Sequence, residues 1–141
     1  QAAIEMEATA NVNILNKDEE TINYPWKIEK LDRIYYIDPA PMWEGILQDL
    51  KQQISPSEIA AKFHISLAIV ITEIVKQLTQ EHKINQVALT GGVFQNRILL
   101  EQTTKHLQKL GIEVFTHSIV PANDGGLSLG QAVIAAARCM R

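Results

Sequence analysis

Two glycine pairs hold most of the residues that could do chemistry in this sequence. The first, Gly91-Gly92, follows the apolar run 87–89 and leads through Asn96 into a helix-like segment. Glycines before a helix remove side chains that would block a ligand, and the unpaired N–H groups of a helix start suit a phosphate or another polar group. Asn96 adds an amide, expected to be exposed, that both donates and accepts hydrogen bonds. A strand-to-helix turn without a ligand explains the same glycines.

The second pair follows the next predicted strand, in the stretch Asn123-Asp124-Gly125-Gly126. The carboxyl ends of neighbouring parallel strands open onto one crevice, so we expect the two glycine turns to form a single site. Asp124 has an alternative role as the N-cap of the last helix. Neither turn has the G-x-G-x-x-G or Walker A pattern, so those phosphate-binding mechanisms are not predicted.

The elements that must position these turns form a β-α-β-α alternation in residues 85–141. We predict strands at 86–90 and 113–117 and helices at 94–110 and 127–138. The alternation favours an α/β sheet with helical cover. Together with the helix-rich residues 1–84, this part is predicted to form a single domain.

Residues 1–84 are predicted to contain helices at 1–8, from residue 41 onward, and from 56 to about 80. Ser55 and Glu58 form a capping-box pattern before the last of these, with proline at its first position. Short β-like runs lie at 21–24, 26–28 and 34–37. The chain begins at Gln1 rather than methionine, and we expect it to be a piece of a longer protein.

Charge and cysteine content narrow the possible partners. The net charge of the 141 residues is −3 and no basic block occurs, which argues against a nucleic-acid or anionic-membrane surface. The single cysteine, Cys139, forms no internal disulfide and fits a reducing compartment, so a cytoplasmic location is expected. No apolar stretch is long enough to span a bilayer.

The four histidines contain no pair three or four residues apart, so no two-histidine metal site on a helix is predicted. We expect His64 to lie on the packing face of the long helix. His82 and His106 are expected to face solvent, and His117 to lie at a strand end beside the crevice.

The segments ALTGGVFQNRILLEQ (88–102) and VPANDGGLSLGQAVIAA (120–136) resemble the C-terminal end of the hydrogenase-maturation carbamoyltransferase family, HypF. The glycine pairs also resemble those of the related enzymes that make threonylcarbamoyladenosine on tRNA. This resemblance implies one lobe of an actin/Hsp70-like ATPase fold, built on a ribonuclease-H-like core. It also implies that the chain is the C-terminal lobe of a larger enzyme.

The resemblance further implies that Gly91, Gly92, Asn96 and Gly125 contact the nucleotide part of a carbamoyl-adenylate made from ATP. Asp124 is implied to bind an active-site divalent metal ion. In the family, the carbamoyl group passes to the C-terminal cysteine of a HypE-type partner protein. The family's upstream domains and the H-x-x-x-H pair that completes its metal site have no counterpart in this chain.

Two alternatives remain open at this point: a lobe of another actin-like kinase or carbamoyltransferase, and a non-catalytic module that docks a partner. We expect the isolated chain to be inactive and to hold no metal ion tightly. The missing lobe would leave an apolar face uncovered, so a homo-oligomer is possible.

Overall fold

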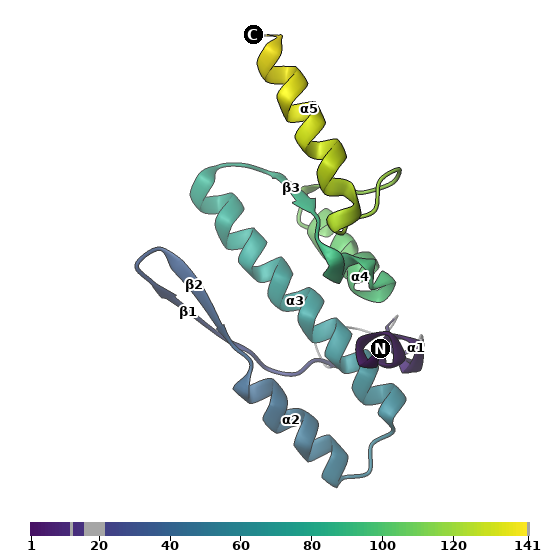
Figure 1. Cartoon of the computed structure of the whole chain (residues 1–141). Coiled ribbons are helices and arrows are strands. Elements are labelled where there is room, and N and C mark those ends of the chain that lie inside the picture. The colour runs from purple at the N-terminus through teal and green to yellow at the C-terminus, as the bar shows by residue number, and fades with distance from the viewer. Residues whose placement is uncertain (12, 16–21, 141) are drawn as a thin grey trace.

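The computed structural model describes residues 1–11, 13–15 and 22–140. Its elements are α1 (Ala2–Thr9), β1 (Lys27–Leu31), β2 (Ile34–Asp38), α2 (Ala40–Lys51), α3 (Pro56–His82), β3 (Gln86–Leu89), the 3₁₀ helix η2 (Gly92–Gln95), α4 (Arg97–Lys109), β4 (Glu113–Thr116), the 3₁₀ helix η3 (Asp124–Gly126) and α5 (Leu127–Cys139). The long α3 crosses the middle of the molecule, with α2 and the β1–β2 hairpin on one side and β3 with α4 on the other (Figure 1). The fold is therefore α/β with a helix-rich first part, as predicted.

Specific residues define where α3 begins and ends. The Ser55 hydroxyl accepts a hydrogen bond from the Glu58 backbone N–H at 3.3 Å, and Pro56 occupies the first helical position. At the other end, Lys83 adopts the left-handed conformation with a φ of 55°. The N-cap predicted at Ser55 is confirmed, and the helix continues two residues beyond the expected Gln80.

The first half of α3 is the centre of the hydrophobic core. One core cluster joins α3 to the segment after α1 (Ala10, Ile14, Leu15, Ala60, Ala61, Ile65). A second joins it to α2 and the chain before β1 (Tyr24, Met42, Ile46, Ile59). Each fully buried isoleucine, leucine or methionine side chain among them contributes about 1.5–3 kcal/mol. These contacts hold α1 and α2 in place around α3.

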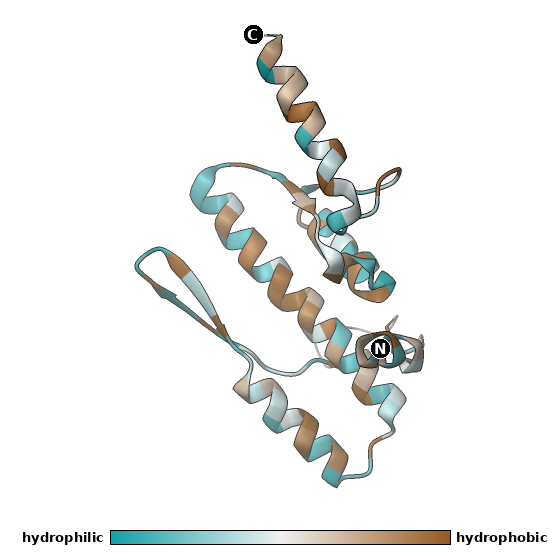
Figure 2. Ribbon diagram, viewed as in Figure 1, coloured by the Kyte–Doolittle hydropathy of each residue, from teal (hydrophilic) through white to brown (hydrophobic). Residues whose placement is uncertain are grey.

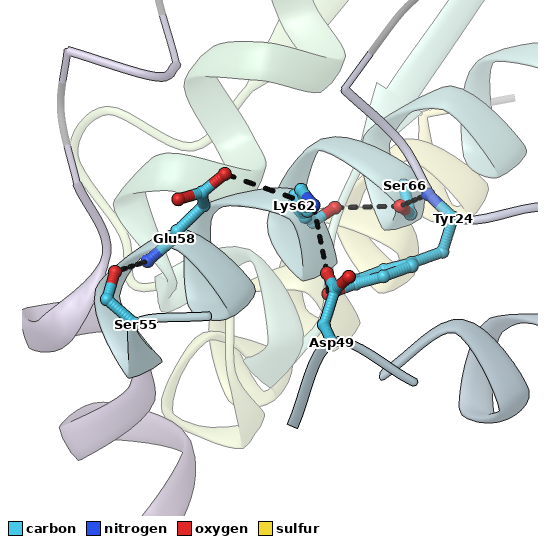
Figure 3. A network of polar contacts seen from close by, with 6 residues as sticks. All are labelled: Tyr24, Asp49, Ser55, Glu58, Lys62 and Ser66. Atoms are coloured by element: carbon cyan, nitrogen blue, oxygen red, sulfur yellow. Dashed lines mark hydrogen bonds and ion pairs between the residues drawn. The ribbon is translucent and has the colours of Figure 1, made fainter. Parts of the chain in front are cut away.

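A polar network adds to the contact between α2 and α3 (Figure 3). Asp49 Oδ2 lies 2.9 Å from Lys62 Nζ and accepts a hydrogen bond from the Tyr24 hydroxyl at 2.8 Å. The Tyr24 N–H donates to Ser66 Oγ at 2.7 Å. Tyr24 is thus bound to a helix, and the strand predicted at 21–24 is wrong for residues 22–24. Thr21 lies outside the described residues.

The strands β1 and β2 form an antiparallel hairpin in which Leu31 pairs with Ile34. Asp32 and Arg33 make the turn with φ values of 47° and 70°, the left-handed conformation that tight hairpin turns require. The predicted strand at 26–28 in fact begins at Lys27 and runs to Leu31. The strand predicted at 34–37 is confirmed and includes one more residue.

The strands β3 and β4 pair in parallel, from Gln86 opposite Glu113 to Leu89 opposite Thr116. The connection between them contains η2 and α4, and α4 packs against α3. Leu89, Leu107 and Ile112 form the core between the strands and α4. The predicted strand-helix-strand order is confirmed, but the expected single helix at 94–110 is divided into η2 and α4.

The last helix, α5, extends away from the rest of the molecule (Figure 1). Every residue from 127 to 139 is exposed, including the apolar ones. Within the described residues, no helix combines the length and the hydropathy needed to cross a membrane.

Candidate functional site

The first glycine turn has one residue that must be glycine and one that has open space around it. Gly91 adopts a φ of 101°, which favours glycine because other side chains are strained there. Gly92 starts η2, is exposed, and a Cβ atom built on it meets no heavy atom within 4 Å. The local turn therefore explains Gly91, but neither backbone conformation nor packing within the described chain explains Gly92.

The second glycine turn is explained by packing within its own loop. A Cβ atom on Gly126 would lie 2.8 Å from the Pro121 carbonyl oxygen, and one on Gly125 would lie 3.1 Å from Asn123 Oδ1. The Gly125 N–H donates to that same oxygen at 3.0 Å. Gly125, predicted to contact the nucleotide, thus already uses its N–H inside the loop.

Asp124 is not the cap predicted as its alternative role. Asn123 is the N-cap of η3 and accepts the Gly125 N–H, and Gly126 precedes α5 without a side-chain cap. The Asp124 side chain is exposed, and its carboxylate has no partner among the described residues. Asn123 takes the cap because its side-chain oxygen reaches the N–H two residues ahead, as asparagine commonly does in turns.

A metal ion would need more ligands than the described chain brings together. No group of three or more His, Cys, Asp or Glu side chains that could hold a metal ion is found among the described residues. Asp124 can therefore offer one free carboxylate, a ligand that hard divalent cations prefer, but this part of the chain does not by itself form a metal site.

The two glycine turns lie side by side, as expected for the ends of parallel strands. The Gly91 N–H donates to the Ala122 carbonyl oxygen at 2.7 Å. One residue before Gly91, Thr90 Oγ1 lies 2.9 Å from His117 Nε2, so His117 does stand at the strand end beside the crevice. A cavity of about 290 Å³ lies between η2 and the segment 117–122 that precedes the second turn, and Phe94, His117 and Ala122 contribute to its wall.

Asn96 is half-buried rather than exposed, and both ends of its amide are bonded. Its Oδ1 accepts the Leu99 N–H at 2.8 Å and so caps α4. Its Nδ2 lies 2.9 Å from His64 Nε2. The expectation of an exposed amide is wrong because α3 supplies a histidine opposite the start of α4.

The start of α4 also receives a carboxylate from α1. Glu7 Oε1 accepts the Arg97 N–H at 2.7 Å, and a negative group at a helix N-terminus is stabilised by the helix dipole. This contact joins residues 90 positions apart, so no local pattern in the sequence could have predicted it. The helix end proposed for a phosphate is therefore partly occupied by the chain itself.

A second, larger cavity of about 690 Å³ opens beside these groups, between α1, α3 and η2. Gly92, Asn96, Glu7 and His64 contribute to its wall. Most of the remaining wall is apolar (Ala2, Ala3, Ile4, Met6, Phe63, Leu67, Val93, Leu99). Its size falls within the range typical of small-molecule sites, and a mainly apolar wall with a few polar groups is the usual lining of such sites.

The structure thus divides the predicted site residues between two places. Gly92 and Asn96 line the larger cavity, with Gly91 adjacent in the chain. Gly125 and Asp124 lie on the neighbouring loop and do not line it. The contribution of α1 to this cavity, including Glu7 and Met6, was not predicted, because the sequence of that helix shows no pattern typical of a binding site.

Among the other histidines, the exposed position of His82 is confirmed, whereas the prediction for His106 is wrong. His106 is 8% exposed and lies on the face of α4 that also buries Leu99, Gln102 and Thr103. That face has the i, i+3, i+4, i+7 spacing of a buried stripe. Because three of its four residues, Gln102, Thr103 and His106, are polar, this buried stripe could not be predicted from hydropathy.

Comparison with known proteins shows the family to which the chain belongs. The family model described as "Carbamoyltransferase, Kae1-like Domain, second subdomain" matches residues 1–131. The carbamoyltransferase HypF of Rhodobacter capsulatus is 42% identical over 102 residues, which cover 72% of this chain and 13% of that protein. A tRNA N6-adenosine threonylcarbamoyltransferase of Clostridium botulinum is 27% identical over 81 residues, or 57% of this chain and 24% of that protein.

The fold is also found in solved structures. A crystal structure of full-length HypF, described as a phosphate- and nucleotide-bound form, matches 95% of this chain and 17% of its own chain with a TM-score of 0.84 and 40% identity. The chain thus spans less than a fifth of the length of these HypF proteins. From the family match and the shared fold, the chain belongs to the HypF carbamoyltransferase family, in which it corresponds to the second subdomain of the Kae1-like domain.

Proposed function

We propose that this chain is the C-terminal lobe of a HypF-type carbamoyltransferase and that the larger cavity holds the nucleoside part of a carbamoyl-adenylate. The observation that carries the proposal is Gly92, which begins η2 at the wall of the cavity. A Cβ atom added to it would meet no heavy atom of the described residues within 4 Å. Glycine at such a position allows a ligand to approach the backbone closely.

The chemistry of the cavity wall fits a nucleoside better than a phosphate group. The apolar side chains of α1 and α3 suit the faces of a base, and Asn96 and Glu7 suit ribose hydroxyls or base edges. The Glu7 carboxylate at the start of α4 disfavours a second anion there. A solved HypF structure similar to this chain is described as phosphate- and nucleotide-bound, which supports a nucleotide as ligand.

In this proposal, the phosphate and carbamoyl end of the ligand points toward the second glycine turn. Gly91 and Gly125 lie in the two adjoining turns, and Asp124 offers one carboxylate to a divalent metal ion whose other ligands come from outside this chain. When bound, such an ion would supply positive charge to the phosphate oxygens. The carbamoyl group would then pass to the terminal cysteine of a HypE-type partner during hydrogenase maturation.

The test compares Gly92→Ala with Gly91→Ala in the full-length protein. If a nucleotide contacts the Gly92 backbone, the added methyl group should weaken binding of AMP or ATP about tenfold. Stability should not fall, because the methyl group meets no heavy atom of the described residues within 4 Å. Gly91→Ala, strained by its φ of 101°, should lower stability in the absence of any ligand.

Titration calorimetry with AMP and ATP measures the affinities, and urea unfolding measures the stabilities. Unchanged nucleotide affinity in Gly92→Ala would show that no ligand approaches this glycine, and the cavity would lose its proposed role. Tighter binding of a carbamoyl-adenylate analogue than of ADP would separate the carbamoyltransferase from a kinase of the same fold.

A further inference from the structure

His64 is a buried histidine that the proposed reaction does not use, and its hydrogen bonds define its tautomer. It is 3% exposed, on the part of α3 that faces the larger cavity. Its Nδ1 lies 2.7 Å from the Ala60 carbonyl oxygen. A carbonyl oxygen only accepts hydrogen bonds, so Nδ1 carries the proton. In the neutral ring, Nε2 is then an acceptor.

The Asn96 amide completes a chain of hydrogen bonds with a single direction. Its Nδ2 donates to His64 Nε2 at 2.9 Å, while its Oδ1 accepts the Leu99 N–H at 2.8 Å. A flipped amide would place Oδ1 against the Nε2 lone pair and an N–H group against the Leu99 N–H. Both contacts would be repulsive, so only one amide orientation satisfies the network.

The cap alone would leave the amide plane free to rotate about one hydrogen bond. The second bond removes that freedom, because it joins the amide to an imidazole ring that is itself held by a hydrogen bond to the backbone of α3. The Phe63 ring packs edge-on against the imidazole with 5.7 Å between centroids, which further restricts the ring. Asn96 still has one N–H and one Oδ1 lone pair unused by these two bonds. Their directions are fixed by the same geometry.

We propose that His64 is a positioning residue that orients the Asn96 amide so that its remaining N–H and lone pair meet the nucleoside at the wall of the larger cavity. The proposal rests on the nucleotide-binding function proposed above and adds to it the group that fixes the donor–acceptor pattern of Asn96. The ligand groups that match this pattern are a nearby acceptor and donor, such as the two hydroxyls of a ribose or one edge of a base.

The experiment uses two substitutions of His64 in the full-length protein. In His64→Gln, the side-chain oxygen reaches the place of Nε2 and can still accept from Asn96. In His64→Leu, the shape is roughly kept but no acceptor remains. His106→Leu is the matched control, since His106 is also buried but does not line the larger cavity.

We expect His64→Leu to weaken AMP binding about two- to tenfold, the loss typical of one hydrogen bond. His64→Gln should restore most of that affinity. His106→Leu should lower stability without changing the affinity. If AMP binds His64→Leu as tightly as the wild type, or if Gln and Leu weaken binding equally, the positioning role is overturned.

A nitrogen-15 spectrum of the wild type provides a readout independent of any ligand. Nδ1 of His64 should carry the proton and Nε2 should be an unprotonated acceptor, and the Asn96 Nδ2 resonance should shift in His64→Leu but not in His106→Leu. A protonated Nε2 would overturn the proposal. If the wild type shows these signals but binds no AMP, the proposed function fails while the orienting contact stands.

Discussion

Asn96 shows how a residue predicted from its chemistry can also have a structural role. Its side chain caps α4 and binds His64. Removing the side chain would therefore break two contacts within the chain in addition to any contact with a ligand. We expect Asn96→Ala to lower the free energy of unfolding by about 0.5–2 kcal/mol, the usual cost of a lost N-cap, and also to weaken nucleotide binding. Urea unfolding without ligand measures the first effect.

Asn96→Asp separates the two contacts of this residue. Aspartate caps a helix as well as asparagine does, but it has no N–H to donate to His64. The Asp variant should therefore be nearly as stable as the wild type, unlike Asn96→Ala, but should still bind nucleotide weakly. Wild-type stability in Asn96→Ala would contradict the capping geometry.

A single substitution at Asp124 tests the proposed metal-binding role of its carboxylate. Because Asn123 makes the cap, Asp124→Asn removes no hydrogen bond of the described chain. We expect an unchanged melting temperature without metal, together with lower metal occupancy and carbamoyl transfer in the full-length protein, since asparagine lacks the carboxylate charge that divalent cations select.

Asn123→Ala is the matched structural control for this site. It removes the cap of η3 but leaves the Asp124 carboxylate in place, so it should lower stability more than Asp124→Asn does. Metal content by elemental analysis and carbamoyl transfer decide the comparison. Wild-type values of both in Asp124→Asn would remove the proposed metal-binding role.

The attachment of α2 to α3 should depend on pH through Asp49. Burial raises the pKa of this carboxyl, but the hydrogen bonds from Lys62 and Tyr24 outweigh burial and hold the pKa below its usual range. A carboxyl with a lower pKa in the folded state stabilises the protein above its unfolded pKa of about 3.9. That contribution is lost as the pH falls through the folded pKa.

We therefore expect the free energy of unfolding to decrease between pH 5 and about pH 3 and this decrease to be smaller in Asp49→Asn. Glu44→Gln is a suitable control, because Glu44 is an exposed carboxylate on the same helix. Urea unfolding at several pH values measures both. An equal acid dependence in Asp49→Asn and the wild type would show that the network contributes little.

The elements that the sequence predicted best are those whose signals are local. The Ser55 cap and the proline after it define the start of α3 within a few residues. The hairpin turn could not be predicted, because Asp32 and Arg33 adopt left-handed conformations without a glycine. The part of the cavity wall that α1 contributes depends on the contact between Glu7 and Arg97, which only the tertiary fold creates.

Two helices of the molecule, α2 and α5, present apolar faces to solvent. On α2 these are Trp43, Leu47 and Leu50, and on α5 they include Leu127, Leu129, Val133 and Ile134, each about half exposed or more. Figure 2 shows brown, hydrophobic segments on both α2 and α5. Faces of this kind usually bind another surface.

We expect the isolated chain to self-associate as its concentration rises, which light scattering over a wide concentration range would detect. Substituting Leu127 and Val133 with lysine should reduce the association, because both side chains lie on the exposed α5. Replacing the exposed Gln131 of the same helix with lysine controls for charge alone. A monomer at all concentrations would show that these faces are too small to drive association.

The chain alone is expected to lack catalytic activity. The described residues form the cavity proposed for a nucleoside and carry the unpaired Asp124 carboxylate, but they include no group of side chains able to hold a metal ion. Stabilising a transition state requires charged groups and reactants held together in one geometry, and HypF relatives are far longer than this chain. We therefore expect residues 1–141 to form no AMP or carbamoyl-AMP from ATP and carbamoyl phosphate.

Detectable binding of AMP by the same preparation would show that the absence of turnover comes from missing catalytic groups rather than from an unfolded cavity. The Gly92→Ala variant, which should bind AMP more weakly, identifies that binding as specific to the cavity. The opposite result would be turnover that depends on carbamoyl phosphate and is lost in Asp124→Asn. Such turnover would mean that the chain assembles the catalytic groups itself. The interface formed by self-association through α2 and α5 would then be the first candidate for their position.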